Sequence, residues 1–213
     1  MRAKLIDNYL YRVNATKIQL SAKELELINN AEIILTKNSI ISKVYDLFGL
    51  LADEFRSTVS VKKLPEQILR WSPKIARGEN YRGLPYVMLD FPRLFEKEDV
   101  FAIRTMFWWG NFFSITLHLK GKYKKAYEEK ICLKYANLRQ LDFYVCISEQ
   151  EWQHHFENDN YVKVGETSEK EFTDLLRQKD FIKLSKRHPV SEWHSVQPFL
   201  EDAFQQIVLL CDD

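Results

Sequence analysis

Residues 100–119, in the middle of the chain, carry one formally charged side chain, Arg104, and six Phe or Trp rings. A stretch this apolar is either a membrane span or part of a buried core. At its centre lie Gly110 and Asn111, two residue types that suit the positive φ angles of a tight two-residue turn. We therefore predict an aromatic β-hairpin, and the arginine and the turn argue against a membrane span.

The predicted turn sets the pairing of the two strands. With a loop of two residues, Trp109 lies opposite Phe112, and the remaining residues pair outward from there. Side chains alternate between the two faces of a strand, so a shift of one residue would exchange the faces. In this register Arg104 lies on an otherwise apolar face, and His118 lies on the opposite, mixed face. We therefore expect that these two side chains do not share one site.

The composition is that of one folded domain. The chain has 213 residues, 46% of them hydrophobic, and only 6 glycines and 6 prolines, which leaves little material for long linkers. We predict a single α+β domain over residues 1–213, with a largely helical part at 1–60, a sheet at 84–165 and a helical part at 166–213. The sheet is expected to be mostly antiparallel, with about four to five strands and with helices from both chain ends mainly on one face.

Charge and cysteine content argue against several classes of protein. The net charge of +1, from 31 basic and 30 acidic residues, gives no overall field that attracts nucleic acid or an anionic membrane. The three cysteines are far apart and form no CxxC pair, which indicates neither a disulfide framework nor a zinc site. Near the N-terminus, Asp7, Asn8 and Arg12 interrupt the apolar stretch before a signal peptide could form. We expect a cytoplasmic protein without a cofactor or a metal.

Two polar patterns predict helix starts. Ser21 with Glu24, and Ser148 with Glu151, match the capping box, in which each side chain bonds the backbone of the other residue. A helix is therefore expected to begin at Ser21. The second pattern is expected to begin a short helix that contains Trp152.

Residues 77–83 (RGENYRG) combine two glycines with Arg77 and Arg82. We predict that this segment is a connecting loop. Its spacing does not match the P-loop or dinucleotide-binding fingerprints, so an anion site here is the less favoured alternative.

Arg104 is the residue whose position is hardest to explain as surface. An unpaired guanidinium in a buried strand is strongly unfavourable, so it needs a carboxylate or an anionic ligand beside it. Asp90 and Asp142 are the candidate partners within the sheet. Alternatively, Arg104 faces a pocket and, with Arg82 or Arg93, holds a carboxylate or phosphate through forked hydrogen bonds.

His118 is of the residue type that serves as a general base, because the pKa of histidine lies near neutrality. The alternative is a partly exposed histidine with no chemical role. The sequence has no GxSxG elbow, no HExxH motif and no recognisable Cys–His pair, so no nucleophile or metal site accompanies it. We therefore favour a protein that is not an enzyme.

Trp108 and Trp109 adjoin the predicted turn and, as neighbours in a strand, point to opposite faces. Some aromatic surface at the hairpin tip should therefore stay partly exposed. Such a tip can stack on a planar ligand, dock against a second copy of the chain, or be covered by a helix of its own domain. RNA binding is not expected, because few basic residues lie among the aromatic ones.

These features lead to two functional hypotheses. The first is a non-catalytic cytosolic binding or assembly module whose aromatic-rich sheet forms a pocket or a homodimer face. The second is a small enzyme that acts on an anionic substrate, a carboxylate or a phosphate, with His118 or Asp90 in acid–base roles. The candidate ligand-binding residues are Arg82, Arg93, Arg104, Trp108, Trp109 and His118.

Overall fold

The computed structural model describes residues 18–212. Contacts between residues divide the chain into two compact units, Met1–Lys43 and Val44–Asp213. The expectation about the apolar stretch near the N-terminus, which concerns Asp7, Asn8 and Arg12, lies outside the described residues. No helix in the described part is both long and apolar enough to cross a membrane.

The first unit contains helix α1 (Ala22–Asn29) and the beginning of helix α2 (Ala31–Ser60). The predicted capping box at Ser21 is confirmed, because the Glu24 backbone N–H donates to the Ser21 hydroxyl and the Glu24 carboxylate accepts from the Ser21 N–H at 2.7 Å. Among the described residues of this unit, eight large apolar side chains are exposed. They are Ile18, Leu20, Leu25, Leu27, Ile28, Ile33, Ile34 and Leu35.

The second unit is built on an antiparallel sheet, which confirms the α+β class. Over the described residues the sheet has seven strands in the order β1-β2-β3-β4-β7-β5-β6, more than the four to five that we predict. The strands are β1 (Lys74–Tyr81), β2 (Leu84–Phe95), β3 (Val100–Trp108), β4 (Phe112–Lys120), β5 (Tyr144–Cys146), β6 (Tyr161–Lys163) and β7 (Phe181–Pro189).

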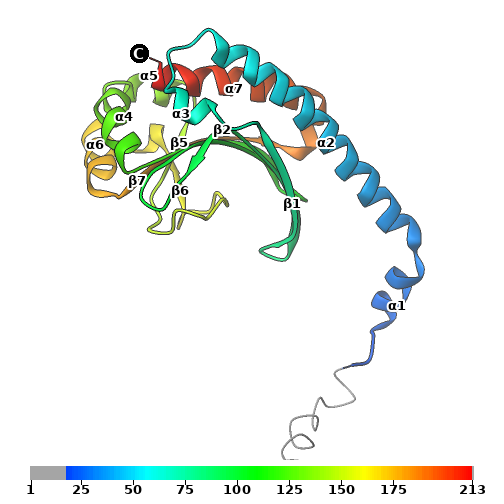
Figure 1. Ribbon diagram of the computed structural model, residues 1–213. Coiled ribbons are helices and arrows are strands. Elements are labelled where there is room, and N and C mark those ends of the chain that lie inside the picture. Colours follow the sequence, from blue (N-terminus) through cyan, green and yellow to red (C-terminus); the bar gives the residue numbers. More distant parts are fainter. Residues whose placement is uncertain (1–17, 213) are drawn as a thin grey trace, which may run out of the picture. The chain divides into compact units, whose positions relative to one another are not determined.

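Helices cover one face of this sheet (Figure 1). From α2, Phe48 meets Phe113 of β4 edge-on, with ring centroids 6.4 Å apart, and Phe55 stacks on Phe204 at 3.7 Å. The helices and turns that follow α2 are α3 (Glu66–Leu69), α4 (Lys122–Cys132), α5 (Tyr135–Gln140), η2 (Val164–Glu166), α6 (Glu169–Gln178), η3 (Val190–Ser195) and α7 (Val196–Cys211).

The hairpin of β3 and β4 is present, but its predicted register is wrong by one residue. Trp108, rather than Trp109, lies opposite Phe112, and the loop has three residues. Arg104 consequently pairs with Thr116. His118 pairs with Ala102, two positions further along the hairpin, and therefore points to the same face as Arg104. Arg104 and His118 therefore share a face of the sheet, contrary to our prediction.

The longer loop has a local cause. Gly110 has a φ of 71°, whereas Asn111 is not among the residues with positive φ, so the pair does not form a turn that needs positive φ at both positions. The backbone N–H of Trp109 donates to the carbonyl of Pro85 at 3.0 Å. That bond continues the pairing of β3 with β2, and it leaves Trp109 in the loop.

Alternation along the strands gives the sheet two faces. The helix-covered face presents the side chains of Phe101, Ile103, Thr105, Phe107, Phe113, Ile115, Leu117, Leu119, Ile182 and Leu184. The opposite face presents Asp90, Arg104, Met106, Trp108, Phe112, Thr116, His118, Lys183, Ser185 and Arg187. Residues 147–160, which we call the covering loop, lie over this second face, so we name it the loop-covered face (Figure 1).

The helix predicted after Ser148 is absent: residues 147–160 of the covering loop contain no helix. The Ser148 hydroxyl accepts from the backbone of Gln150 at 3.1 Å, which is a local turn. The Glu151 carboxylate instead lies 3.1 Å from the ammonium of Lys120 on β4. The residue that would complete the capping box is therefore engaged by the sheet.

The predicted loop at 77–83 is also wrong, because its first five residues belong to β1. The turn itself consists of Arg82 and Gly83, whose φ angles of 50° and 85° are both positive, as a two-residue hairpin turn requires. At the other end of the chain, β7 lies within 166–213, the part in which we predict helices.

Candidate functional site

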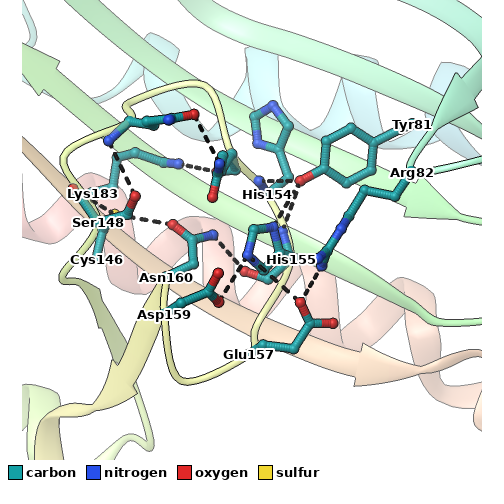
Figure 2. Close-up of polar contacts among 12 residues, drawn as sticks. Tyr81, Arg82, Cys146, Ser148, His154, His155, Glu157, Asp159, Asn160 and Lys183 are labelled. Carbon is teal, nitrogen blue, oxygen red and sulfur yellow. Dashed lines mark hydrogen bonds and ion pairs between the residues drawn. The ribbon is translucent and has the colours of Figure 1, made fainter.

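The covering loop is anchored to the sheet by buried polar contacts (Figure 2). The Tyr81 hydroxyl oxygen accepts the backbone N–H groups of His154 at 2.7 Å and His155 at 3.1 Å. Within the loop itself, the side chain of Asn160, which is fully buried, donates to the His155 carbonyl at 2.6 Å. The loop is thus held at several points by hydrogen bonds rather than by helical structure.

Arg104 and Asp90 form a forked ion pair on the loop-covered face. The Arg104 Nε lies 2.6 Å from Oδ1 of Asp90, and Nη2 lies 2.9 Å from Oδ2. The two residues are direct neighbours across β2 and β3. His154 of the covering loop adds a contact of 3.4 Å to Nη1. Of the two partners that the sequence suggests, Asp90 is therefore the one that binds Arg104, while Asp142 lies 3.6 Å from Lys163.

His118 is buried beside an acid. Its Nε2 lies 3.6 Å from Oε2 of Glu151, whose other oxygen contacts Lys120. The contacts with His118 and Lys120 lower the pKa of Glu151 to about 2. Burial lowers the pKa of His118, and burial together with the charges of Lys183 and Arg104 lowers the pKa of His154.

Lys183 is the most unusual group on this face, because its side chain is almost fully buried. Its ammonium donates to the carbonyl of Gln153 in the covering loop and lies 5.2 Å from the centroid of the Tyr161 ring. Burial lowers the pKa of Lys183 to about 8. The Tyr161 hydroxyl makes no hydrogen bond within the described part of the chain, and burial raises its pKa.

Within the described residues, His155, Glu157 and Asp159 each have one side-chain atom that could bind a metal ion, and these three atoms lie within 4.8 Å of one another. The Tyr81 oxygen already accepts two amides, so its hydrogen points to Nδ1 of His155, 3.2 Å away. The ring proton is then on Nε2, which donates to Asp159 at 3.1 Å. Arg82 is paired with Glu157. These side chains thus form a complete hydrogen-bonded network that ties the loop to the β1–β2 turn.

The structure does not gather the predicted arginines into one site. Arg82 is used by the network just described, at the far end of the β1–β2 hairpin. Arg93 donates to the carbonyl of Ser72 at 3.1 Å and lies over the ring of Trp71. Only Arg104 lies under the covering loop with His118, and it is occupied by Asp90.

The aromatic hairpin tip is largely covered by its own chain. Trp108 is buried and donates from Nε1 to the carbonyl of Tyr81 at 3.2 Å. Trp109 is half-buried and meets Phe107 edge-on at 6.2 Å. Trp108 is thus covered by its own domain, but by Tyr81 and Phe112 rather than by a helix, as the third alternative supposed.

A cavity of about 710 Å³ adjoins the tip of the hairpin, beside the C-terminal half of β7. We call it the tip pocket. Its volume lies in the range of small-molecule sites. Its lining residues are Asn111, Phe112, Gln140, Leu141, Asp142, Tyr144, Lys163, Lys186, Arg187, Pro189, Phe199, Asp202 and Gln206.

The tip pocket differs from the interior of the loop-covered face in its arginine: Arg104 is paired with Asp90, whereas Arg187 contacts aromatic rings. Its guanidinium lies over the rings of Tyr144 and Phe156, 5.3 and 5.4 Å from their centroids. It forms no hydrogen bond and no ion pair with any other residue that the structure describes. Its side chain is exposed, so the aromatic rings hold a cation at the pocket without neutralising it.

The other charges of the tip pocket are partly balanced. Lys186 donates to the side chain of Gln206 at 3.0 Å, and burial lowers its pKa. Lys163 lies 3.6 Å from Asp142, and Asp202 is the second acid of the lining. Three cations against two acids leave the pocket positive by one charge.

Arg187 is not among the binding residues predicted from the sequence. The run Lys186-Arg187-His188 before Pro189 was the available signal. Without the strand assignment of β7, however, nothing indicated that Arg187 lies on the same face as the aromatic hairpin residues.

Comparison with protein-family models, with curated proteins and with solved structures found no match for this chain. Function is therefore inferred from geometry and chemistry alone.

Proposed function

We propose that the protein is a non-catalytic binding module that holds an anionic ligand, a carboxylate or a phosphate, in the tip pocket. Arg187 is the observation that carries this proposal. It is an exposed guanidinium that lies over two aromatic rings, beside a cavity of about 710 Å³, and it has no acidic partner among the described residues. A planar guanidinium is the side chain best suited to bind carboxylates and phosphates through two parallel hydrogen bonds.

The surroundings of Arg187 also support binding rather than a structural role. Stacking on Tyr144 and Phe156 restricts the side chain, so less conformational entropy is lost when a ligand binds. By contrast, Arg104 has its forked hydrogen bonds filled by Asp90. An assembly function through the hairpin aromatics is less favoured, because Trp108 and Phe112 are buried within the chain.

Two-dimensional NMR during titration with inorganic phosphate, and separately with citrate, tests this proposal. We expect saturable shifts of backbone amides that line the tip pocket, such as those of Asn111, Tyr144 and Arg187. Arg187→Gln should weaken binding about tenfold or more, because it removes a charge-assisted pair.

Arg56→Gln is the matched control, since Arg56 is also exposed but lies on α2 and pairs with Asp53. This variant should bind as tightly as the wild type. Equal affinity in the wild type and Arg187→Gln, or shifts confined to other surfaces, would reject the tip pocket as the binding site.

A further inference from the structure

Strand β7 is paired very unequally on its two sides. On one side β4 accompanies it over its whole length, from Phe181 to Pro189. On the other side β5 pairs only with Leu184 and Ser185. Among the described residues, the last four positions of β7 therefore have no strand on that side. Backbone groups of a strand point alternately to its two neighbours, so this edge presents unpaired hydrogen-bonding groups.

The chain itself leaves this edge open. Just before β5, Asp142 has a φ of 56°, and the N–H of Phe143 donates to the carbonyl of Leu138 at 3.1 Å. The segment that precedes β5 thus bends toward α5 instead of continuing along β7. The tip pocket occupies the position that a longer β5 would fill, because Lys186, Arg187 and Pro189 line it together with Tyr144.

Two cations lie near the ring of Tyr144, beside the place where an added strand would end. Across β5 and β6, Tyr144 pairs with Lys163, whose ammonium lies 5.9 Å from the centroid of the Tyr144 ring. The guanidinium of Arg187 lies 5.3 Å from the same ring. A segment placed in line with β5, and antiparallel to β7 as β5 is, would end before Tyr144, which itself pairs with Ser185.

We propose that the ligand of the tip pocket is the free C-terminus of an extended peptide, which adds to the open edge of β7 and places its carboxylate between Arg187 and Lys163. This inference rests on the proposed function, since it names the source of the bound anion. Main-chain hydrogen bonds to Lys186–His188 hold the peptide, and the two cations select its terminal carboxylate. The lining acids Asp142 and Asp202 lower the affinity for peptides with acidic side chains, so recognition depends on the terminal group.

A randomised hexapeptide library with free C-terminal carboxylates, passed over the full-length immobilised protein, tests this inference. The same library with C-terminal amides is the control. We expect retention of free acids, and the corresponding amides of the retained peptides should bind about tenfold or more weakly. N-methylation of alternate peptide amides, those that face β7, should reduce binding to a similar extent, whereas methylation of the intervening amides should not.

Peptide variants keep the protein unchanged, so misfolding cannot produce these results. Retention of no peptide, equal binding of acids and amides, or equal effects of both methylation sets would overturn the peptide inference. If phosphate or citrate still binds the tip pocket in an Arg187-dependent manner, the proposed function survives that outcome. If no anion binds there, the proposed function fails as well, and the two failures are thereby distinguished.

Discussion

The two faces of the central sheet are both well buried, but they are built from different chemistry. Under the helices, Phe48, Phe113 and Phe204 are buried apolar side chains, and Phe48 contacts Phe113 directly. Under the covering loop, ion pairs and hydrogen bonds such as that of Arg104 with Asp90 alternate with aromatic rings. Apolar packing tolerates small shifts, whereas each buried polar group needs a partner in a defined position.

This difference suggests what each face contributes. The apolar face supplies most of the hydrophobic stabilisation, because that term scales with the apolar area removed from water. The polar face fixes the position of the covering loop. Through Phe156 of that loop, it also determines where the guanidinium of Arg187 lies beside the tip pocket.

Truncation of a large side chain should cost most on the helix-covered face. Phe204→Ala removes a fully buried ring that stacks on Phe55, and it should lower the free energy of unfolding by about 3–5 kcal/mol. Phe156→Ala, the same change in the covering loop, should cost less, because a loop can relax or open locally. Urea unfolding of both variants measures the difference. Equal losses would show that the covering loop is as integral to the core as α7.

Removal of one charge on the loop-covered face should cost nearly as much. Asp90→Asn leaves the guanidinium of Arg104 without its carboxylate, and we expect a loss of about 3 kcal/mol. Adding Arg104→Met should recover most of this loss, because the double variant has no unpaired charge. A double variant as unstable as Asp90→Asn would show that the unpaired guanidinium is not the cause of the loss.

Stability should depend on pH through the buried histidines. The pKa values of His118 and His154 are lowered in the folded state by burial, so the unfolded chain binds protons more readily near pH 6.5. Their contribution is full above that pH and is lost as the pH falls below it. Urea unfolding between pH 7.5 and about 5 should show the decline, and His154→Gln should reduce its slope. A flat profile would contradict the buried, neutral state. The Glu151 carboxylate does not interfere, since its contribution is lost only below its ordinary pKa of 4.5.

Replacement of the buried lysine should give the smallest change, and in the opposite direction. Lys183→Met removes a charge that has no carboxylate partner in the described part of the chain, so the free energy of unfolding at pH 7 should rise by about 1 kcal/mol. Since the pKa of Lys183 is about 8 in the folded state, the wild type should recover stability as the pH rises from 8 toward the ordinary lysine value of 10.5. A destabilised variant would indicate that the ammonium holds Gln153 in place.

Several features of the fold could be predicted from the sequence, because they depend on local chemistry. The α+β class, the helix that begins at Ser21 and the hairpin around Gly110 follow from capping, alternation and turn residues. A buried arginine required a carboxylate, and Asp90 was one of two candidates.

The remainder depended on contacts between distant segments. A single hydrogen bond from Trp109 to Pro85 is associated with a shift in the hairpin register, and that shift decides whether Arg104 and His118 share a face. In β7, the residues Lys183, Ser185 and Arg187 look like solvent-facing positions of a surface segment. They are placed on the loop-covered face by a pairing with β4, which lies more than 60 residues earlier in the chain. No local pattern in the sequence reports that pairing.

We infer that the ion pair of Arg104 with Asp90 under the covering loop stabilises the fold, whereas Arg187 serves binding. Both halves of this inference are tested together by measuring, for Arg187→Gln, the free energy of unfolding and the calorimetric affinity for phosphate. We predict a change in unfolding free energy within about 1 kcal/mol, together with an affinity weakened about tenfold or more. An unchanged affinity, or a loss of stability like that of Asp90→Asn, would show that Arg187 serves the fold rather than binding.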